Sequence, residues 1–241
     1  MSVKEHYDNH LAAVYSWMLG DLDTKVSDFL QILDTAGIGS GKGKTALDMG
    51  CGHGIQSIAL AKSGFEVISV DFNNEMLYEL INNAQGLAVT AQQDDIRNIA
   101  AYAHYKPDLV SCCGDTLVLL ADKKEIEQFI KDAATILQAG GLLLLHFRDY
   151  TNAVEDTDRF IPVRSTKDRI LTCVLEYFED KVRITDLLHE KEKNSFRQYA
   201  SSYYKVRIGP DDTLNMAKKA KLKQTFLSNN NKRVVQVFQK L

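Results

Sequence analysis

The sequence lacks several features that would mark other classes of protein. It has three prolines, at positions 107, 162 and 210, so few points interrupt regular structure. No apolar run approaches the ~20 residues that a membrane-spanning helix needs. The first ten residues lack the apolar core of a secretory signal. These absences predict a cytoplasmic protein that does not enter a membrane.

Cysteine is also scarce. The four cysteines are Cys51, Cys112, Cys113 and Cys173. Their spacing fits neither a disulfide framework nor a zinc site. We therefore expect reduced thiols, as in the cytoplasm. Cys112 and Cys113 lie in an apolar stretch, so we expect them to be small buried side chains.

Positive charge is not in excess. The formal net charge is −3, which does not favour a nucleic-acid partner in the absence of a local basic patch. Lysines 218, 219, 221 and 223 are close together, and we interpret them as a solvated face. The sequence does not indicate whether the protein is a monomer or a homo-oligomer.

Short apolar segments alternate with amphipathic ones between residues 44 and 147. The apolar pattern predicts strands at 45–49, 65–71, 86–92, 108–114 and 142–147. Helical patterns occupy 24–37, 54–64, 74–84 and 123–141. Strands that alternate with helices over short links predict an α/β fold, with a doubly wound (Rossmann-like) parallel sheet.

After Tyr150 the pattern changes to one typical of antiparallel strands. Segments 169–179, 181–192 and 198–208 are rich in β-forming residues, with a turn expected at Glu179–Asp180. A helix then begins at Pro210, and two strands follow around the polar run 228–232. We interpret 1–241 as a single domain. Its expected parts are an N-terminal lid and helix (1–40), a core (44–150), a late β insertion (151–208) and a closing helix and strands (209–241).

Two glycine-rich runs flank the first strand. The run "GSGKGKT" precedes that strand and has Ile38 where a phosphate loop requires glycine, so we interpret it as a flexible link. The run "LDMGCGHG" follows the strand and opens a helix, at the edge where open α/β sheets bind ligands. Gly50 and Gly52 there let a ligand approach the backbone closely. The second run is therefore the predicted site.

Three carboxylates accompany this loop. Asp48 either braces the loop or lies near a cationic group of a ligand. Asp71 ends the second strand, where a carboxylate accepts both hydroxyls of a ribose. Asn73 fits a helix cap better than Asp71 does. Asp95 follows the third strand and is placed to accept from an adenine amino group, with the backbone of Ile96 nearby.

These landmarks, in this order and spacing, resemble class I S-adenosylmethionine-dependent methyltransferases. The resemblance covers "LDMGCGHG", "VISVDFNNEML", "QQDDIRN", "DLVSCCGDTL" and "AGGLLLLHFRDY", with the closing helix–strand–strand pattern. It implies S-adenosyl-L-methionine as cofactor and S-adenosyl-L-homocysteine as product. The cofactor-binding residues that it implies are Tyr15, Lys25, Asp48, Gly50, Cys51, Gly52, Asp71, Phe72, Met76, Asp95, Ile96, Cys113 and Gly114.

The chain ends resemble the glycine and sarcosine N-methyltransferase branch. That match places Lys25 at the methionyl carboxylate, Arg148 at the carboxylate of the acceptor, and Tyr7 near the acceptor. Asp115 stands where the branch has asparagine, and Met18 replaces a pocket tyrosine. A salt bridge from Arg148 to Asp115 or Asp149 is the structural alternative.

Histidines and tyrosines complete the candidates. His146 near the end of the fifth strand faces the pocket or is a satisfied core histidine. His53 is expected at the surface. Tyr199, Tyr203 and Tyr204 are candidates to line the acceptor side, although neighbours on a strand face opposite ways. The candidate catalytic residues are Arg148, Tyr7, His146 and Asp115, with no metal.

The sequence thus predicts in-line methyl transfer to a small polar acceptor, at nitrogen or oxygen. The sulfonium is already activated, so the protein mainly supplies orientation and excludes water. The alternatives are a methyltransferase acting on RNA or protein, and a non-catalytic protein that binds S-adenosylmethionine.

Overall fold

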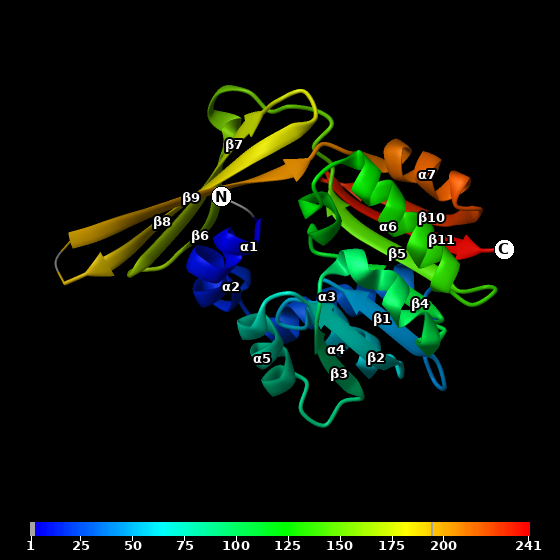
Figure 1. Cartoon of the computed structure of the whole chain (residues 1–241). Coiled ribbons are helices and arrows are strands. Elements are labelled where there is room, and N and C mark those ends of the chain that lie inside the picture. The colour runs from blue at the N-terminus through cyan, green and yellow to red at the C-terminus, as the bar shows by residue number, and fades with distance from the viewer. Residues whose placement is uncertain (1–2, 194) are drawn as a thin grey trace.

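The computed structural model describes residues 3–193 and 195–241 (Figure 1). The elements, in chain order, are α1 Val3–His6, the π-helical turn η1 Tyr7–Leu11, α2 Ala12–Leu19, α3 Leu22–Thr35, β1 Thr45–Met49, α4 Ile55–Lys62, β2 Glu66–Asp71, α5 Asn74–Asn83, β3 Val89–Gln93, η2 Ile96–Tyr105, β4 Leu109–Cys112, η3 Thr116–Leu119, α6 Lys123–Ile136, β5 Leu142–Arg148, η4 Asp156–Arg159, β6 Phe160–Ser165, β7 Arg169–Tyr177, β8 Lys181–Glu192, β9 Ser195–Val206, α7 Pro210–Lys219, β10 Leu222–Asn230 and β11 Arg233–Lys240.

Seven strands form the main sheet in the order β10-β11-β5-β4-β1-β2-β3. The five strands from β3 to β5 are parallel, and β11 runs antiparallel to both β5 and β10. The strand order reverses between β1 and β4, which is where ligands bind in open α/β sheets. The doubly wound α/β prediction is confirmed, together with its closing antiparallel hairpin.

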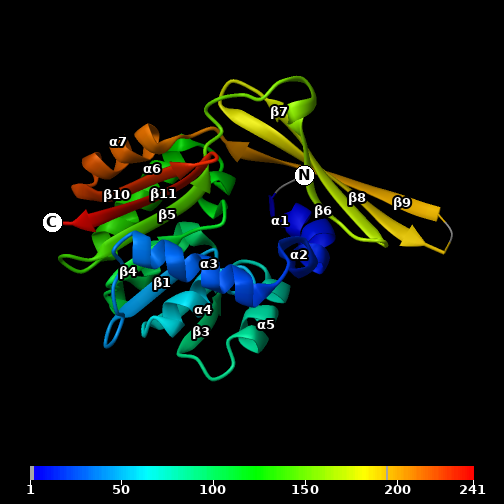
Figure 2. The same ribbon diagram turned by 180° about the vertical axis from the view of Figure 1, so that it is seen from behind.

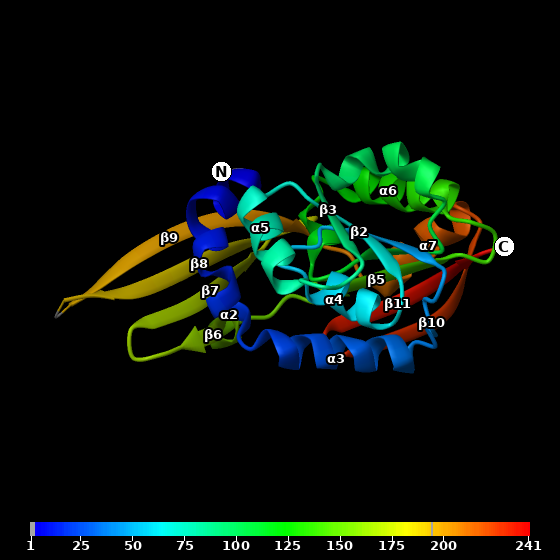
Figure 3. The same cartoon turned by 90° about the horizontal axis from the view of Figure 1, so that it is seen from below.

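Helices cover the two faces of this sheet. Helix α3 lies on one side and α6 with α7 on the other (Figures 2 and 3). The residues of β5 alternate between two apolar clusters: Leu143, Leu145 and Phe147 pack in one, and Leu144 packs in the other. By the same alternation, His146 and Arg148 lie on the face that α3 shares with Leu144.

Local signals in the sequence fix several helix starts. Asn73 caps α5 by accepting from the backbone N–H of Met76 at 3.0 Å, as predicted. Asp122 caps α6 by accepting from the backbone N–H groups of Lys124 and Glu125. Asp21 caps α3, so that helix begins two residues before the predicted start.

The segment after β5 forms a second sheet with the order β6-β7-β8-β9. All its pairings are antiparallel, and the predicted turn at Glu179–Asp180 joins β7 to β8. Strand β6 was not predicted, because Pro162 interrupts its pattern. Proline is tolerated there because β6 is an edge strand. The sheet projects away from the main sheet, and α1 and α2 lie against it (Figure 3).

Other boundaries differ from the sequence expectation. The polar run 228–232 was expected to be a turn, but β10 extends through Asn230, and the turn is Asn231–Lys232. Strand pairing with β11 satisfies these polar residues, so pairing outweighs their preference for turns. Cys112 and Cys113 are buried, as predicted.

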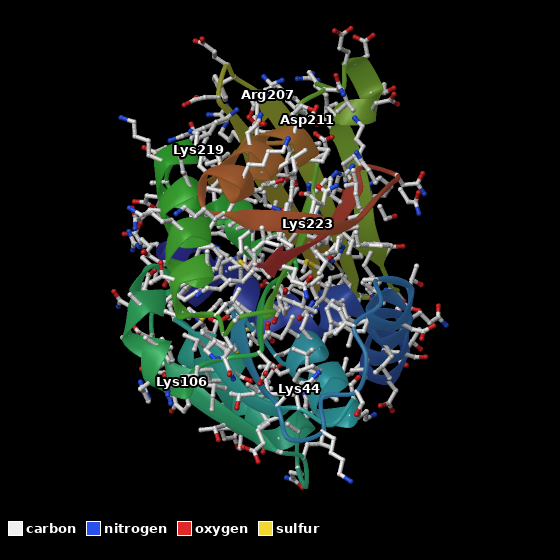
Figure 4. All side chains as sticks on the ribbon, turned by 90° about the vertical axis from the view of Figure 1, so that its right-hand side faces the viewer. Lys44, Lys106, Arg207, Asp211, Lys219 and Lys223 are labelled. Carbon is white, nitrogen blue, oxygen red and sulfur yellow. The ribbon has the colours of Figure 1, made fainter. Side chains whose placement is uncertain are left out.

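The exposed lysines lie on the outer end of the molecule. Lys219 and Lys223 occupy the face shown in Figure 4, and Lys219 donates to Glu127 at 2.8 Å. Their role as a plain solvated face stays a prediction. Within the described residues, none of the helices has the length and apolar character to cross a bilayer.

Candidate functional site

A cavity of about 1180 Å³ lies at the carboxyl ends of the parallel strands. The main sheet, α3, the N-terminal helices and the second sheet all contribute to its walls. The sequence-predicted residues that line it are Tyr7, Tyr15, Lys25, Gly50, Cys51, Gly52, Asp71, Phe72, Asp95, Ile96, Cys113, Gly114, Asp115, His146 and Arg148. Residues from separate parts of the sequence therefore meet in one space.

The glycine loop after β1 has the backbone that the sequence suggested. Gly50 has φ of +82°, and a Cβ there would lie 2.2 Å from Cγ2 of Thr116. Gly52 has φ of +52°, and a Cβ there would have only the Tyr15 ring within 4 Å. Gly50 is thus required for packing, while Gly52 leaves the cavity open for a ligand.

Asp71 ties this loop to the end of β2. Its Oδ2 accepts from the backbone N–H of Gly52 at 2.9 Å, and its Oδ1 accepts from that of Asn73 at 2.9 Å. Burial raises the pKa of the Asp71 carboxyl, although these backbone donors oppose the shift. The carboxylate remains at the cavity wall with lone pairs free for hydroxyl donors.

Asp48 and Met76 do not line the cavity. Asp48 is buried and accepts from Ser57 Oγ at 2.6 Å and Ser111 Oγ at 2.8 Å. Burial raises its pKa to about 6, against the effect of those two hydroxyls. Of the two interpretations of Asp48, the structure shows the brace. Met76 is buried in α5.

Asp95 faces the cavity, and its neighbour Asp94 does not. Both oxygens of Asp95 accept from the Arg97 side chain, at 2.9 and 2.6 Å. The hydrogen bonds and charge of Arg97 lower the pKa of this carboxyl. Ile96 is buried beside it.

Aromatic rings from the N-terminal segment cover the cavity beside the glycine loop. The Tyr7 ring lies 5.8 Å from that of Phe72 and 6.2 Å from that of Tyr15, centroid to centroid. The Tyr15 ring meets His53 edge to face at 5.2 Å. The surface prediction for His53 is wrong: it is buried, because α2 lies over it. Lys25 in α3 is partly exposed, with its Nζ 3.8 Å from Asp28.

Asp115 is the centre of the other end of the cavity. It accepts from Lys205 Nζ at 2.7 Å and from the backbone N–H of Arg148 at 2.7 Å, and Arg233 Nη1 lies 3.5 Å away. Burial would raise the pKa of Asp115, but the charges of Lys205 and Arg233 outweigh it and hold that pKa well below its usual range. Lys205 also donates to the Tyr150 hydroxyl at 3.3 Å.

The sequence reasoning missed Lys205 and Arg233. Alternation along β9 was the available signal for Lys205, because it shares a face with Tyr203. Tyr203 lines the cavity, whereas Tyr204 is exposed and Tyr199 pairs with Glu192. Of the three tyrosine candidates, only Tyr203 is at the cavity.

The guanidinium of Arg148 has no carboxylate within 4.0 Å among the residues that the structure describes. It lies 6.0 Å from the centre of the Tyr150 ring. The expected salt bridge to Asp115 or Asp149 is not formed, because the backbone of Arg148, and not its side chain, reaches Asp115. Arg148 is therefore a cation at the cavity wall with no paired acid.

His146 is the neutral polar group beside it. Burial and the charge of Arg233 lower the pKa of His146, so its imidazole is neutral at pH 7. Its Nδ1 is buried and has no hydrogen-bond partner in residues 3–193 and 195–241. A neutral imidazole at this position is able to accept a proton.

The N-terminal helices are docked through His6, which the sequence reasoning also missed. His6 Nδ1 lies 2.6 Å from Ser201 Oγ, and Nε2 lies 3.2 Å from Asp186 Oδ2. The imidazole stacks on Tyr203 with ring centres 4.2 Å apart. This buried cluster fastens α1 to the second sheet, on the side of the cavity lined by Asp186 and Tyr203.

Part of the chain matches known methyltransferases. Residues 46–141 match the family described as "Methyltransferase domain". The chain is 29% identical over 148 residues to cypemycin N-terminal methyltransferase of Streptomyces sp, covering 56% of this chain and 60% of that protein. It is 28% identical over 114 residues to glycine/sarcosine N-methyltransferase of Parasynechococcus marenigrum (strain WH8102), covering 46% and 40%. Each match thus spans less than two thirds of the relative.

The fold also has solved counterparts. A S-adenosylmethionine-dependent methyltransferase from Clostridium acetobutylicum ATCC 824 superposes with a TM-score of 0.73, at 17% identity, over 98% of this chain and 96% of that one. At that identity the likeness shows the fold. The family match covers the glycine loop and β1 to α6, the half of the sheet that carries Asp71 and Asp95. Residues 46–141 therefore match a methyltransferase domain, and the chain shares its fold with that solved methyltransferase.

Proposed function

We propose that the chain transfers a methyl group from S-adenosylmethionine to a small polar acceptor, at nitrogen or oxygen. One observation carries the proposal: a single cavity joins the glycine loop and Asp71 to Tyr7, His146 and Arg148. Two reactants held in one enclosed space react as if in a single molecule, which removes much of the entropic barrier.

The residues at the glycine-loop end suit the cofactor. Asp71 would accept from the ribose hydroxyls, and Asp95 with Ile96 would border the adenine. Lys25 would meet the methionyl carboxylate. Gly52 and Gly114 leave the wall open, since a Cβ on either would have no atom nearer than 3.7 Å. When bound, the cofactor supplies an activated sulfonium methyl group.

The residues at the other end suit the acceptor. The Arg148 guanidinium is available to an anionic group of the acceptor, because no acid in the described residues lies within 4.0 Å of it. The neutral His146 imidazole would take the proton that an amine must lose before attack. Tyr7 and the docked N-terminal helices would exclude water. The printed names of both curated relatives favour nitrogen.

A methyl-transfer screen tests this function. Purified protein is incubated with radiolabelled S-adenosylmethionine and, separately, small amines, carboxylic acids, phenols, bulk RNA and a protein extract. We expect label in one small-molecule class, and much less with Asp71→Ala. Label in RNA or protein would contradict the small-acceptor proposal. Intact cofactor binding without transfer to any acceptor would indicate a non-catalytic binding protein.

Net charge and cysteine content bear on the compartment and the partners of the protein. We propose that residues 1–241 work as one unit in the cytoplasm, without a nucleic-acid partner. The net charge of −3 and the four free cysteines support this.

A further inference from the structure

Two arginines stand side by side at the acceptor end of the cavity. Arg148 on β5 is the direct register partner of Arg233 on β11 in an antiparallel ladder. Directly opposite residues project from the same face of a sheet, and both of these line the cavity. Like charges in this position destabilise a sheet. An anion between them would reverse that effect.

The local charges leave an excess of positive charge. Lys205 adds a third cation to the two arginines, and Asp115 is the carboxylate that Lys205 and Arg233 share. Its Oδ2 binds Lys205, while its Oδ1 takes the Arg148 backbone N–H and lies 3.5 Å from Arg233. Three positive charges against one negative charge leave two positive charges unbalanced.

Other acids in the cavity wall do not provide the missing charge. Asp28 lies by Lys25, Asp95 and Glu125 lie by Arg97, and Asp71 accepts from backbone N–H groups. Asp186 accepts from Cys173 and faces His6. None of them lies within 4.0 Å of the Arg148 guanidinium in the described part of the chain.

Polar donors extend this row of cations. Asn230 on β10 is the register partner of Arg233, and Ser228 is that of Val235. Both line the cavity, so the row Asn230–Arg233–Arg148 crosses three strands at one edge of the sheet. Amide and hydroxyl groups beside two guanidinium groups are suited to an oxygen-rich anion.

Part of the opposite wall is apolar. Ile161 and Val163 of β6, Leu175 of β7 and Ile184 of β8 line the cavity from the second sheet. The total volume, about 1180 Å³, exceeds the roughly 300–1,000 Å³ of a pocket for one drug-sized ligand. Beside the cofactor, there is room for an acceptor with an apolar body.

We propose that the acceptor carries a doubly charged anionic group, a phosphate monoester, held between Arg148 and Arg233, with an apolar body against the second sheet. The inference rests on the proposed function, and it extends the acceptor site to the closing hairpin. Arginine forks bind phosphate oxygens through paired hydrogen bonds, which a single lysine charge does not reproduce.

Three aromatic ligands of similar size separate the effect of ligand charge on binding from the effect of ligand shape. Phenyl phosphate, benzoate and benzyl alcohol are titrated by calorimetry into protein saturated with S-adenosylhomocysteine. The measurement is made at about pH 8, where a phosphate monoester carries two charges. We expect phenyl phosphate to bind roughly tenfold more tightly than benzoate, and benzyl alcohol most weakly. Arg233→Gln should abolish the preference for phenyl phosphate over benzoate.

The control is Arg183→Gln, a half-buried arginine paired with Glu176 outside the cavity, which should leave all three affinities unchanged. Should Arg233→Gln fail to fold, Arg233→Lys keeps the charge, and we expect it to weaken phenyl phosphate severalfold. Equal binding of phenyl phosphate and benzyl alcohol would overturn the inference, as would an Arg233→Gln protein with unchanged preference. If the parent protein does not bind S-adenosylhomocysteine, the proposed function is contradicted. Phenyl phosphate titrated into the cofactor-free protein would then still test the subsite.

Discussion

At the scale of single residues, the carboxylates in this fold have different tasks because their partners differ. Asp71 is held by two backbone N–H groups, Asp48 by two serine hydroxyls, and Asp115 by Lys205 and a backbone N–H. Asp71 and Asp115 border the cavity, whereas Asp48 lies behind it. Only the first two are therefore placed to meet a ligand.

Asp71→Ala should weaken the binding of S-adenosylmethionine. A hydrogen bond to a charged group contributes about 1.5–3 kcal/mol, so we expect roughly a 10- to 100-fold loss of affinity by calorimetry. Asp23→Ala, an exposed carboxylate of α3 outside the cavity, is the matched control and should bind as the parent does. An Asp71→Ala protein with the affinity of the parent would show that the cofactor site is misplaced.

Asp48 should make folding stability depend on pH. Its pKa in the folded protein is about 6, above its ordinary value of 3.8, so the folded state retains the proton longer. As pH rises from about 3.8 to about 6, Asp48 loses its proton first in the unfolded chain, and the free energy of unfolding falls. At about 1.4 kcal/mol per pKa unit, the loss approaches about 3 kcal/mol above the folded pKa.

Asp48→Asn isolates this effect, because an amide cannot ionise and its oxygen still accepts from serine. We expect the free energy of unfolding of the variant, relative to the parent, to rise by about 3 kcal/mol between about pH 4 and pH 7.5. Urea unfolding at a series of pH values measures it. If the free energies of unfolding of the two proteins change in parallel with pH, the pKa of Asp48 is not raised.

At the scale of elements, the N-terminal helices hold their place by long-range contacts. Helices α1 and α2 are short, and such helices have little stability alone. His6 bonds to Ser201 in β9, and Asp8 accepts from Asn73 Nδ2 at 2.8 Å. These contacts keep Tyr7 and Tyr15 over the cavity, so the segment closes one side of the site.

His6→Ala should loosen residues 3–19. It removes a buried ring and its hydrogen bond, and we expect the opening free energy to fall by about 2–4 kcal/mol. Hydrogen exchange of this segment should speed up accordingly. His6→Phe keeps the stacking on Tyr203 and should show an intermediate effect.

The exposed His104→Ala, in η2, serves as the control for that experiment. It should leave exchange in residues 3–19 unchanged. If His6→Ala also leaves that exchange unchanged, the His6 contacts do not hold the segment, and the docking interpretation is wrong.

At the scale of the whole molecule, two sheets enclose one cavity, so ligand binding should stabilise both. At a concentration 100 times its Kd, a ligand that binds only the folded state adds about 2.7 kcal/mol. For a chain of this size we expect S-adenosylhomocysteine to raise Tm by about 5–10 °C. NAD should give no shift, and a comparable shift with NAD would favour a dinucleotide site instead.

Much of the fold was predictable from the sequence alone, for a local reason. The period of apolar residues depends on neighbours along the chain, and it predicted β1 and β8 to the residue. The glycine loop, Asp71 and the Asn73 cap were likewise found, because each acts within a few residues of its own position. Strand β6 was not predicted, because Pro162 interrupts its local pattern.

The tertiary structure decided the end of the cavity that holds Asp115. Asp115 meets Lys205 and Arg233, which lie 90 and 118 residues away, and His6 meets Ser201 across 195 residues. His53 is buried because α2 folds over the loop, which its own neighbours do not reveal. No periodicity encodes such pairings, since they depend on how the second sheet and the closing hairpin dock onto the main sheet. The sequence by itself therefore determined the class of fold and the glycine loop, and only packing brought together the charges around Asp115.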